Sequence, residues 1–390
     1  MFELFYAGFD TIDIAIAGAL PKDALARLKA AREQAQETQE EALVNIGPGE
    51  VQMHVSGHGM RGGYAFLCDT GPLGAKWMVK ENTDPRQWNL FVSPRAQALL
   101  AYGYAQTWEL ILADLAAMGG TVTDISLNRV DFAMDFRTKG FELRQDCVVA
   151  HTRTKVAPYW GKRPAETDME DRNQPSAVMR GRRLESLTIG KQPGRQIILY
   201  DKRREAVEKQ KPFWFKTWGV DRDDPTLEVW RIEVRAGKKE LKDKYQIRSL
   251  DDFEDSIGDV IVNALQEVRY LAHQQTDGNV IRQELHPIWA KAQEEAAGNL
   301  LALRSGLTPD QVKEIERGQA VETYSKLAHS NAIGLAVALG LSDAEIMKGL
   351  FAHIAPFLEP KAARDFERMK ETIERVRGKL VFQEQIASLP

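Results

Sequence analysis

Two carboxylates stand close together in a segment that alternates polar and apolar residues. Residues 128–136 read Asn-Arg-Val-Asp-Phe-Ala-Met-Asp-Phe, so Asp131 and Asp135 lie four residues apart. In a strand, residues two apart share a face, so both acids would lie on one face together with Arg129. Neighbouring carboxylates repel unless a cation lies between them, and oxygen ligands suit Mg²⁺ or Mn²⁺.

A second polar strand is expected at residues 230–235, which read Trp-Arg-Ile-Glu-Val-Arg. Alternation sends Arg231, Glu233 and Arg235 to one face. Glu233 could add a third carboxylate to the two of the first segment and so complete a set of metal ligands. The alternative for each strand is an exposed polar face with ion pairs, which contribute little to stability.

A tyrosine stands between these two strands, in the segment Ile-Leu-Tyr-Asp-Lys-Arg-Arg-Glu at residues 198–205. Tyr200 closes an apolar run and is followed at once by Asp201 and Lys202. A phenol is a poor nucleophile until its proton is removed, since its ordinary pKa is near 10. A metal ion or Lys202 could assist. Attack on a phosphodiester would leave phosphotyrosine on the 5′ side and a free 3′ hydroxyl; the alternative is a core tyrosine whose hydroxyl is only hydrogen-bonded.

Positive charge is concentrated around this tyrosine. Residues 172–216 hold 12 Lys or Arg and 4 Asp or Glu, and they end near the aromatic residues Phe213, Trp214, Phe215 and Trp218. Cations beside aromatic faces suit a nucleic acid strand, and the alternative is a solvated basic loop over an aromatic core. We expect DNA contacts at Arg129, Arg180, Arg182, Arg183, Lys191, Arg195, Arg203 and Arg231.

Several other chemistries have no support in the sequence. There is no Walker loop, no Gly-x-Ser-x-Gly and no His-hydrophobic-His triplet, and the two cysteines, Cys68 and Cys147, have no zinc-ligand spacing. No apolar run approaches the roughly 18 residues that a bilayer requires, and the first ten residues are acidic and aromatic, unlike a signal peptide. We therefore expect a cytoplasmic protein without a membrane partner.

Hydrophobic periodicity predicts the elements that would position these residues. Strands are expected at residues 9–16, 125–136, 184–190, 195–200 and 227–235, with a meander of short strands at 51–92. Helices are expected at residues 22–43, 96–118, 144–152, 201–211 and 250–274. From residue 278 onward the pattern is wholly helical. The expected fold is α+β, an antiparallel-sheet catalytic region followed by an all-α C-terminal region.

The order of elements occurs twice, which indicates a duplicated β-rich unit. Placing residues 13–17 on 131–135 keeps an Asp-x-Ala core, and placing 90–95 on 198–203 keeps a strand that passes into a helix. Val92 would then stand where Tyr200 is, so chemistry would survive in the second copy alone. Chance likeness of short segments is the alternative. The expected domains are an N-terminal α+β half at 1–124, a catalytic half at 125–277 and a helical region at 278–390.

Taken together, these segments resemble the replication initiation factor family. The resemblance rests on Arg-Val-Asp-Phe-Ala-Met-Asp at 129–135, on Gly-Lys and Gly-Arg leading into Leu-Tyr-Asp-Lys-Arg-Arg-Glu at 190–205, and on Arg-Ile-Glu at 231–233. The family comprises rolling-circle initiators of plasmids and filamentous phages and relaxases of some conjugative elements. The family's Gly-Ser-Arg is Gly190-Lys191-Gln192 here, a departure that would alter a DNA contact.

The resemblance implies a DNA strand transferase with a tyrosine nucleophile and a divalent metal ion, Mg²⁺ or Mn²⁺, working as a dimer at an origin hairpin or single strand. Carried over by position, the tyrosine motif is Tyr200, Lys202 and Glu205, and the acidic strand positions are Asp131, Asp135 and Glu233. The helical tail could recognise the origin, dimerise or recruit a host helicase. The rivals are a conjugative relaxase with the same chemistry, a non-catalytic DNA-binding regulator, and a metal nuclease that uses water.

Overall fold

The structure is a computed structural model that describes residues 2–150, 177–274, 283–303, 305–364 and 366–383. The chain divides into two compact units, Met1–Pro309 and Asp310–Pro390. The first unit contains β1 (Glu3–Ala19), α1 (Lys22–Thr38), β2 (Ala42–Ile46), β3 (Val51–Val55), β4 (Phe66–Asp69), β5 (Ala75–Val79), β6 (Trp88–Pro94), α2 (Ala96–Ala117), β7 (Thr121–Thr138), β8 (Val148–Ala150), β9 (Ala177–Arg180), β10 (Arg183–Gly190), β11 (Arg195–Asp201), α3 (Lys202–Glu208), α4 (Phe213–Trp218), β12 (Glu228–Gly237), α5 (Leu250–Glu267), β13 (Val268–Tyr270) and α6 (Pro287–Ala296). The second unit contains α7 (Pro309–Ala338), α8 (Asp343–Arg364) and α9 (Phe366–Lys379).

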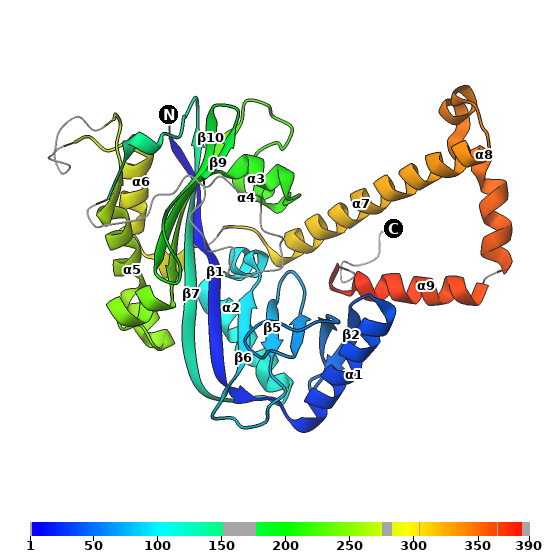
Figure 1. The fold of residues 1–390 in the computed structure, drawn as a ribbon, viewed down its shortest axis with the longest axis horizontal. Coiled ribbons are helices and arrows are strands. Elements are labelled where there is room, and N and C mark those ends of the chain that lie inside the picture. The colour runs from blue at the N-terminus through cyan, green and yellow to red at the C-terminus, as the bar shows by residue number, and fades with distance from the viewer. Residues whose placement is uncertain (1, 151–176, 275–282, 304, 365, 384–390) are drawn as a thin grey trace. The chain divides into compact units, whose positions relative to one another are not determined.

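Within the described residues, eleven strands form one sheet in the order β2-β3-β4-β5-β6-β1-β7-β12-β11-β10-β9. The pairs around the centre are all antiparallel, and the long strands β1 and β7 lie side by side in the middle. Figure 1 shows α5 and α6 on one side of the second half of the sheet and α3 and α4 on the other. The predicted α+β class, an antiparallel sheet followed by a helical region, is confirmed.

One face of the sheet is apolar because alternate residues of the central strands are large hydrophobic side chains. Trp230, Ile232 and Val234 of β12 are fully buried, and each such side chain contributes about 1.5–3 kcal/mol on burial. Helix α5 packs on this face and begins with a capping box, in which Ser249 and Asp252 each accept a backbone N–H of the other. A slip of one residue in register would expose this whole apolar set, so the pattern fixes which face is the core.

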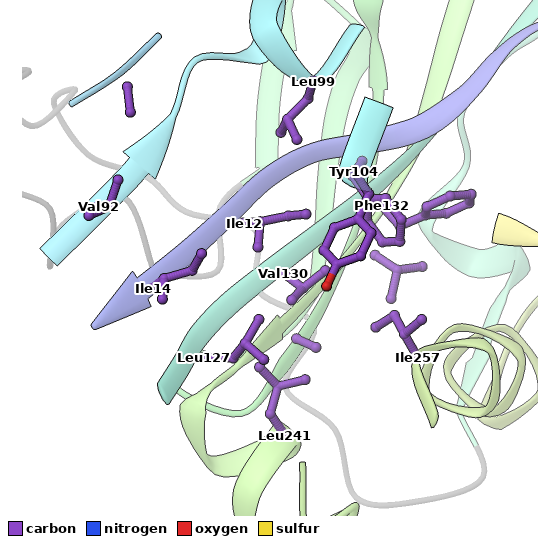
Figure 2. Packing of buried hydrophobic residues seen from close by; sticks show 14 of the residues in the cluster. Ile12, Ile14, Val92, Leu99, Tyr104, Leu127, Val130, Phe132, Leu241 and Ile257 are labelled. Carbon is purple, nitrogen blue, oxygen red and sulfur yellow. The ribbon is translucent and has the colours of Figure 1, made fainter. Parts of the chain in front are cut away.

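The centre of the core lies where the two long strands meet two helices. Figure 2 shows Ile12 of β1 and Val130 and Phe132 of β7 beside Tyr104 of α2 and Ile257 of α5. Ile12 pairs with Val130, and these two residues are 118 positions apart. The aligned segments 13–17 and 131–135 differ by the same offset. The pairing of β1 with β7 is therefore symmetric about the pair of Ile12 and Val130.

Every pair in this ladder has a counterpart under that offset. Asp13 pairs with Arg129 and Thr11 with Asp131, while Ala15 pairs with Ser126 and Gly8 with Ala133. The two strands are therefore related by a local twofold axis, which is the arrangement that a duplicated unit would produce. The irregularities of the ladder follow the same offset, since Phe5 and Asp10 are skipped in β1 and Thr123 and Asn128 in β7. This agrees with the alignment of 13–17 with 131–135.

The second part of the predicted alignment, residues 90–95 on 198–203, is wrong. Strand β6 is the neighbour of β1, and the corresponding neighbour of β7 is β12 rather than β11. Strand β11 corresponds to β5 instead. The error arose because both β6 and β11 pass directly into a helix, a local feature that does not specify position in the sheet.

Two other elements differ from the expected pattern. The described residues of the segment 144–152 form a 3₁₀ turn and the short strand β8 rather than a helix. Helix α6, grouped by the sequence with the helical region from residue 278 onward, belongs to the first unit. The Trp289 indole of α6 donates to the carbonyls of Leu265 and Val268 and so ties this helix to α5.

The second unit is helical throughout its described residues. Its buried apolar cluster consists of Ala332 and Ala336 of α7 with Leu350 and Ile354 of α8. None of the described helices of either unit is long and apolar enough to cross a membrane.

Candidate active site

Three neighbouring strands bring the predicted reactive residues to one face. Backbone pairing places Asp135 of β7 opposite Arg231 of β12, and Arg231 opposite Tyr200 of β11. Glu233 follows Arg231 by two residues and therefore shares its face. This polar face is the reverse of the one that packs on α5.

Tyr200 is half-buried at the end of β11. Its hydroxyl donates to Glu233 Oε2 at 2.9 Å and accepts from Lys202 Nζ at 3.5 Å. Burial and the charge of Glu233 raise the pKa of Tyr200 well above its ordinary value. The hydroxyl is therefore neutral at rest and held between an anion and an amine, and it needs an acceptor for its proton before it can attack.

Lys202 owes its position to the start of α3. Asp201 caps this helix, accepting from the Arg204 backbone N–H at 3.0 Å, so Lys202 is the first helical residue. The Lys202 side chain is 2% exposed, and its ammonium lies 4.7 Å from the centre of the Trp214 ring. Burial, with a contribution from the charge of Arg231, lowers the pKa of Lys202 to about 8.

Glu205 contacts this lysine rather than the tyrosine. Its carboxylate accepts from Lys202 Nζ at 2.7 Å and from Lys211 Nζ at 2.9 Å. Burial works to raise the pKa of Glu205, but the lysine charges outweigh it and hold the pKa well below its usual range. Glu205 is thus a fixed anion that orients the Lys202 amine.

Arg231 is completely buried and joins several elements. Its guanidinium donates to both oxygens of Asp135, at 2.5 and 2.8 Å, and to Asp10 at 2.8 Å. It also lies 4.1 Å from the centre of the Trp214 ring, and Trp218 Nε1 donates to Asp135. These contacts hold the pair of Arg231 and Asp135 in place beside Tyr200 and Lys202.

Sequence reasoning missed the role of Asp10. It lies at an irregularity of β1, where Phe9 pairs with Phe132 and Thr11 with Asp131, so Asp10 has no partner in the ladder. A bulge re-aims the extra side chain, here toward Arg231. Alternation alone could not have found it. Trp214 and Trp218 were noted as aromatic neighbours of the basic segment, but their contacts with Lys202, Arg231 and Asp135 were not predicted.

The other two predicted metal ligands are also held by arginines. Asp131 is 1% exposed and accepts from Arg129 at 2.8 and 2.5 Å, and Arg235 Nε lies 3.7 Å from it. Arg235 Nε donates to Glu233 at 2.6 Å. Although burial works to raise it, the charges of Arg235 and Arg231 lower the pKa of Glu233 to about 2.

This donor set does not fit a divalent ion that uses all three carboxylates. Arg235 lies between Asp131 and Glu233, where such an ion would bind, and both oxygens of Asp135 are bound to Arg231. Within the described ranges, no group of three His, Cys, Asp or Glu is arranged to hold a metal ion. The Mg²⁺ or Mn²⁺ ion stays a prediction from the sequence.

The predicted DNA-binding residues fall into two groups. Arg129 and Arg231 lie at the site, whereas the others lie on β9, β10, β11, α3 or their turns. Arg182 and Lys191 are exposed, and the side chain of Arg180 lies outside the described part. Arg183 pairs with Asp201, Arg195 with Glu267, and Arg203 donates to the carbonyls of Arg222 and Asp224.

No family model matches the sequence, and no curated protein matches it. Among solved structures, the chain is similar to the rolling circle replication initiator protein from Geobacillus stearothermophilus. The match covers 79% of this chain and 100% of that chain, with 13% sequence identity and a TM-score of 0.36. At this identity and score, the function of the chain has to follow from its own residues.

Proposed function

We propose that the protein is a rolling-circle replication initiator that cuts and rejoins one DNA strand at an origin through Tyr200. The observation that carries the proposal is the position of the Tyr200 hydroxyl, between Glu233 Oε2 and Lys202 Nζ on the polar face of the sheet. Nucleophile, proton acceptor and orienting group lie within hydrogen-bond reach of one another, as covalent catalysis requires.

In the proposed step, Tyr200 Oη attacks the phosphorus of the scissile phosphodiester. The Oη–P bond forms and the P–O3′ bond breaks, which leaves a 5′-phosphotyrosyl adduct. The hydroxyl turns from Glu233 toward the neutral amine of Lys202 and gives it the phenolic proton, and the leaving O3′ takes a proton from water to become a 3′ hydroxyl. The reverse reaction, with a 3′ hydroxyl as the nucleophile, rejoins the strand.

Lys202 rather than Glu233 is assigned as the base. A general base works best when its pKa lies near the working pH. The pKa of Lys202 is lowered to about 8, whereas that of Glu233 is lowered to about 2. Glu233 therefore stays ionised and orients the hydroxyl, and Glu205 positions the amine.

Arginines at the edge of the site would contact the scissile phosphate. Arg129 and Arg235 are 21% and 18% exposed, while their inner faces are held by Asp131 and Glu233. Guanidinium groups held in place before the reaction can stabilise charge that develops on phosphate oxygens.

The biological setting is part of the same proposal. The expected partners are a single-stranded or hairpin origin, a second copy of the chain and a host helicase, and the expected location is the cytoplasm. A relaxase of a conjugative element would use the same residues and chemistry. A regulator that binds DNA without cutting it is the alternative from another class.

A covalent adduct between the protein and single-stranded DNA from its own locus tests the proposal. Wild-type protein should form the adduct, and the Tyr200→Phe variant should not, while retaining its affinity for DNA within a few-fold. Wild-type protein that binds DNA but forms no adduct would favour the regulator.

A further inference from the structure

The local twofold axis extends beyond the two central strands. In the first half Ala15 pairs with Phe91 and Phe91 with Met78; in the second half Ala133 pairs with Glu233 and Glu233 with Ile198. Since Ala15 corresponds to Ala133, Phe91 occupies the position of Glu233. The ladders continue outward to Leu67, the partner of Met78, and to Thr188, the partner of Ile198.

This register places Lys80 at the position of Tyr200. Lys80 follows Met78 by two residues, as Tyr200 follows Ile198, and its backbone N–H continues the ladder to the carbonyl of Asn89. Ala17 corresponds to Asp135 through the same offset that relates the central strands. The first half therefore has neither the nucleophile nor the carboxylates of Glu233 and Asp135.

The first half instead has an aromatic–lysine cluster, formed by Lys80, Tyr64 and Phe91. Lys80 Nζ lies 5.1 Å from the centre of the Tyr64 ring, and the rings of Tyr64 and Phe91 meet edge to face at 6.2 Å. All three side chains of this aromatic–lysine cluster are half-buried. An amine beside two partly open aromatic rings is a combination that binds a phosphate and a stacked base.

The residues around the cluster leave room for the backbone of a DNA strand. Gly62 and Gly63 lie directly before Tyr64 and have φ values of +87° and +84°. Gly63 has nothing within 4 Å of the place where a Cβ would stand. On β5, Lys76 shares the face of Lys80. Of the acids nearby, Asp69 is paired with Arg95, and Glu81 lies near Lys29.

We propose that the aromatic–lysine cluster is a second, unreactive binding site for single-stranded DNA on the same face of the sheet as Tyr200. A base would stack on Tyr64 or Phe91, and Lys80 would contact a phosphate. Five strand-to-strand steps separate β5 from β11, which corresponds to about 24 Å across the sheet. This inference deepens the proposed function, because it assigns the unreactive half to holding the strand that the other half cuts.

The test compares variants in a Tyr200→Phe background, so that cutting cannot affect the binding measurement. The probe is a fluorescein-labelled oligothymidylate of about 20 nucleotides, long enough for several binding footprints, followed by fluorescence anisotropy. Tyr64→Leu should weaken binding about tenfold through lost stacking. Lys80→Gln should weaken it several-fold and reduce the slope of log Kd against log salt by about 0.7, the value of one phosphate contact.

Lys29→Gln is the matched control, because it removes a lysine of the same half from α1, which packs on the apolar side of the sheet. It should leave affinity and salt slope unchanged. Unchanged affinity and slope in Lys80→Gln, with the melting temperature retained, would overturn the inference, as would equal weakening by Lys29→Gln. The affinities decide this point whether or not Tyr200 forms an adduct, so a failure of the proposed chemistry would be seen separately.

Discussion

Tyr200 and Glu233 meet diagonally across two neighbouring strands. The backbone partner of Tyr200 is Arg231, yet its hydroxyl donates to Glu233, two residues further along β12, at 2.9 Å. Diagonal neighbours on one face of an antiparallel pair are within reach of long and aromatic side chains. The contact thus depends on register, and it holds the phenol oxygen within reach of Lys202.

Replacing Glu233 by Gln should reduce the rate of adduct formation about 100-fold, because the hydroxyl loses the anion that orients it. DNA affinity should stay within threefold of wild type. Single-turnover gel assays measure the rate, and Glu208→Gln, an exposed acid of the neighbouring helix, is the control. A rate within threefold of wild type would show that Glu233 does not position the nucleophile.

The pH dependence of cleavage should follow Lys202. Its pKa is lowered to about 8, so the amine is mostly protonated below that pH and neutral above it. Since the neutral amine accepts the proton of Tyr200, the single-turnover rate should rise with pH through a midpoint near 8 and then level off. Lys202→Gln should be slow and lack this rise. A wild-type rate that falls above pH 8 would instead mean that the charged ammonium is required.

The pair formed by Asp135 and Arg231 should matter for folding. Both side chains are fully buried, and losing one partner of a buried pair costs about 3–5 kcal/mol. Asp135→Ala would leave the Arg231 charge with Asp10 but without its fully buried partner. Asp135→Ala should lower the free energy of unfolding by that amount in urea titrations. Glu374→Ala, which breaks an exposed pair with Arg377, should have little effect. A loss below about 1 kcal/mol for Asp135→Ala would mean that Arg231 readily finds another partner.

A divalent ion at the predicted site would compete with Arg235 for the carboxylates of Asp131 and Glu233. The Arg235→Met variant keeps the pair of Arg129 with Asp131, but it removes the guanidinium that binds Glu233 and lies near Asp131. Mn²⁺ should therefore bind this variant at least tenfold more tightly than wild type. Isothermal calorimetry without DNA makes the comparison. Equal affinities would show that an ion, where one binds, does not use these two residues.

The sequence predicted the strands of the site well because their alternation is regular. The acids at 131, 135 and 233 were expected on polar faces, and Tyr200 was expected at the end of an apolar strand beside charged residues. The structure brings these strands together. Alternation places Arg129 on the face of Asp131 and Arg235 on the face of Glu233, and these residues do pair. The pairing of Asp135 with Arg231 depends on strand order, which the pattern of one strand does not give. Asp10 lies at a bulge, which turns its side chain out of the regular alternation. The alternating pattern therefore could not predict where this side chain points.

The sequence also predicted only part of the duplication. The offset between 13–17 and 131–135 could be read from matching residues, whereas the correspondence between β5 and β11 follows only from the sheet order. Lys80 and Tyr200 share no chemistry that an alignment could detect. The predicted helix at 144–152 failed for a related reason, since residues 148–150 pair with β13 through backbone contacts distant in sequence.

The most direct test of the central claim is to identify the residue that becomes attached to DNA. Purified protein is incubated with labelled single-stranded DNA from its own locus, with and without Mn²⁺, and the denatured adduct is digested and mapped by mass spectrometry. We expect a 5′-phosphotyrosyl bond to Tyr200 and a free 3′ hydroxyl on the released fragment. Cleavage without an adduct, or an adduct on another tyrosine, would contradict it.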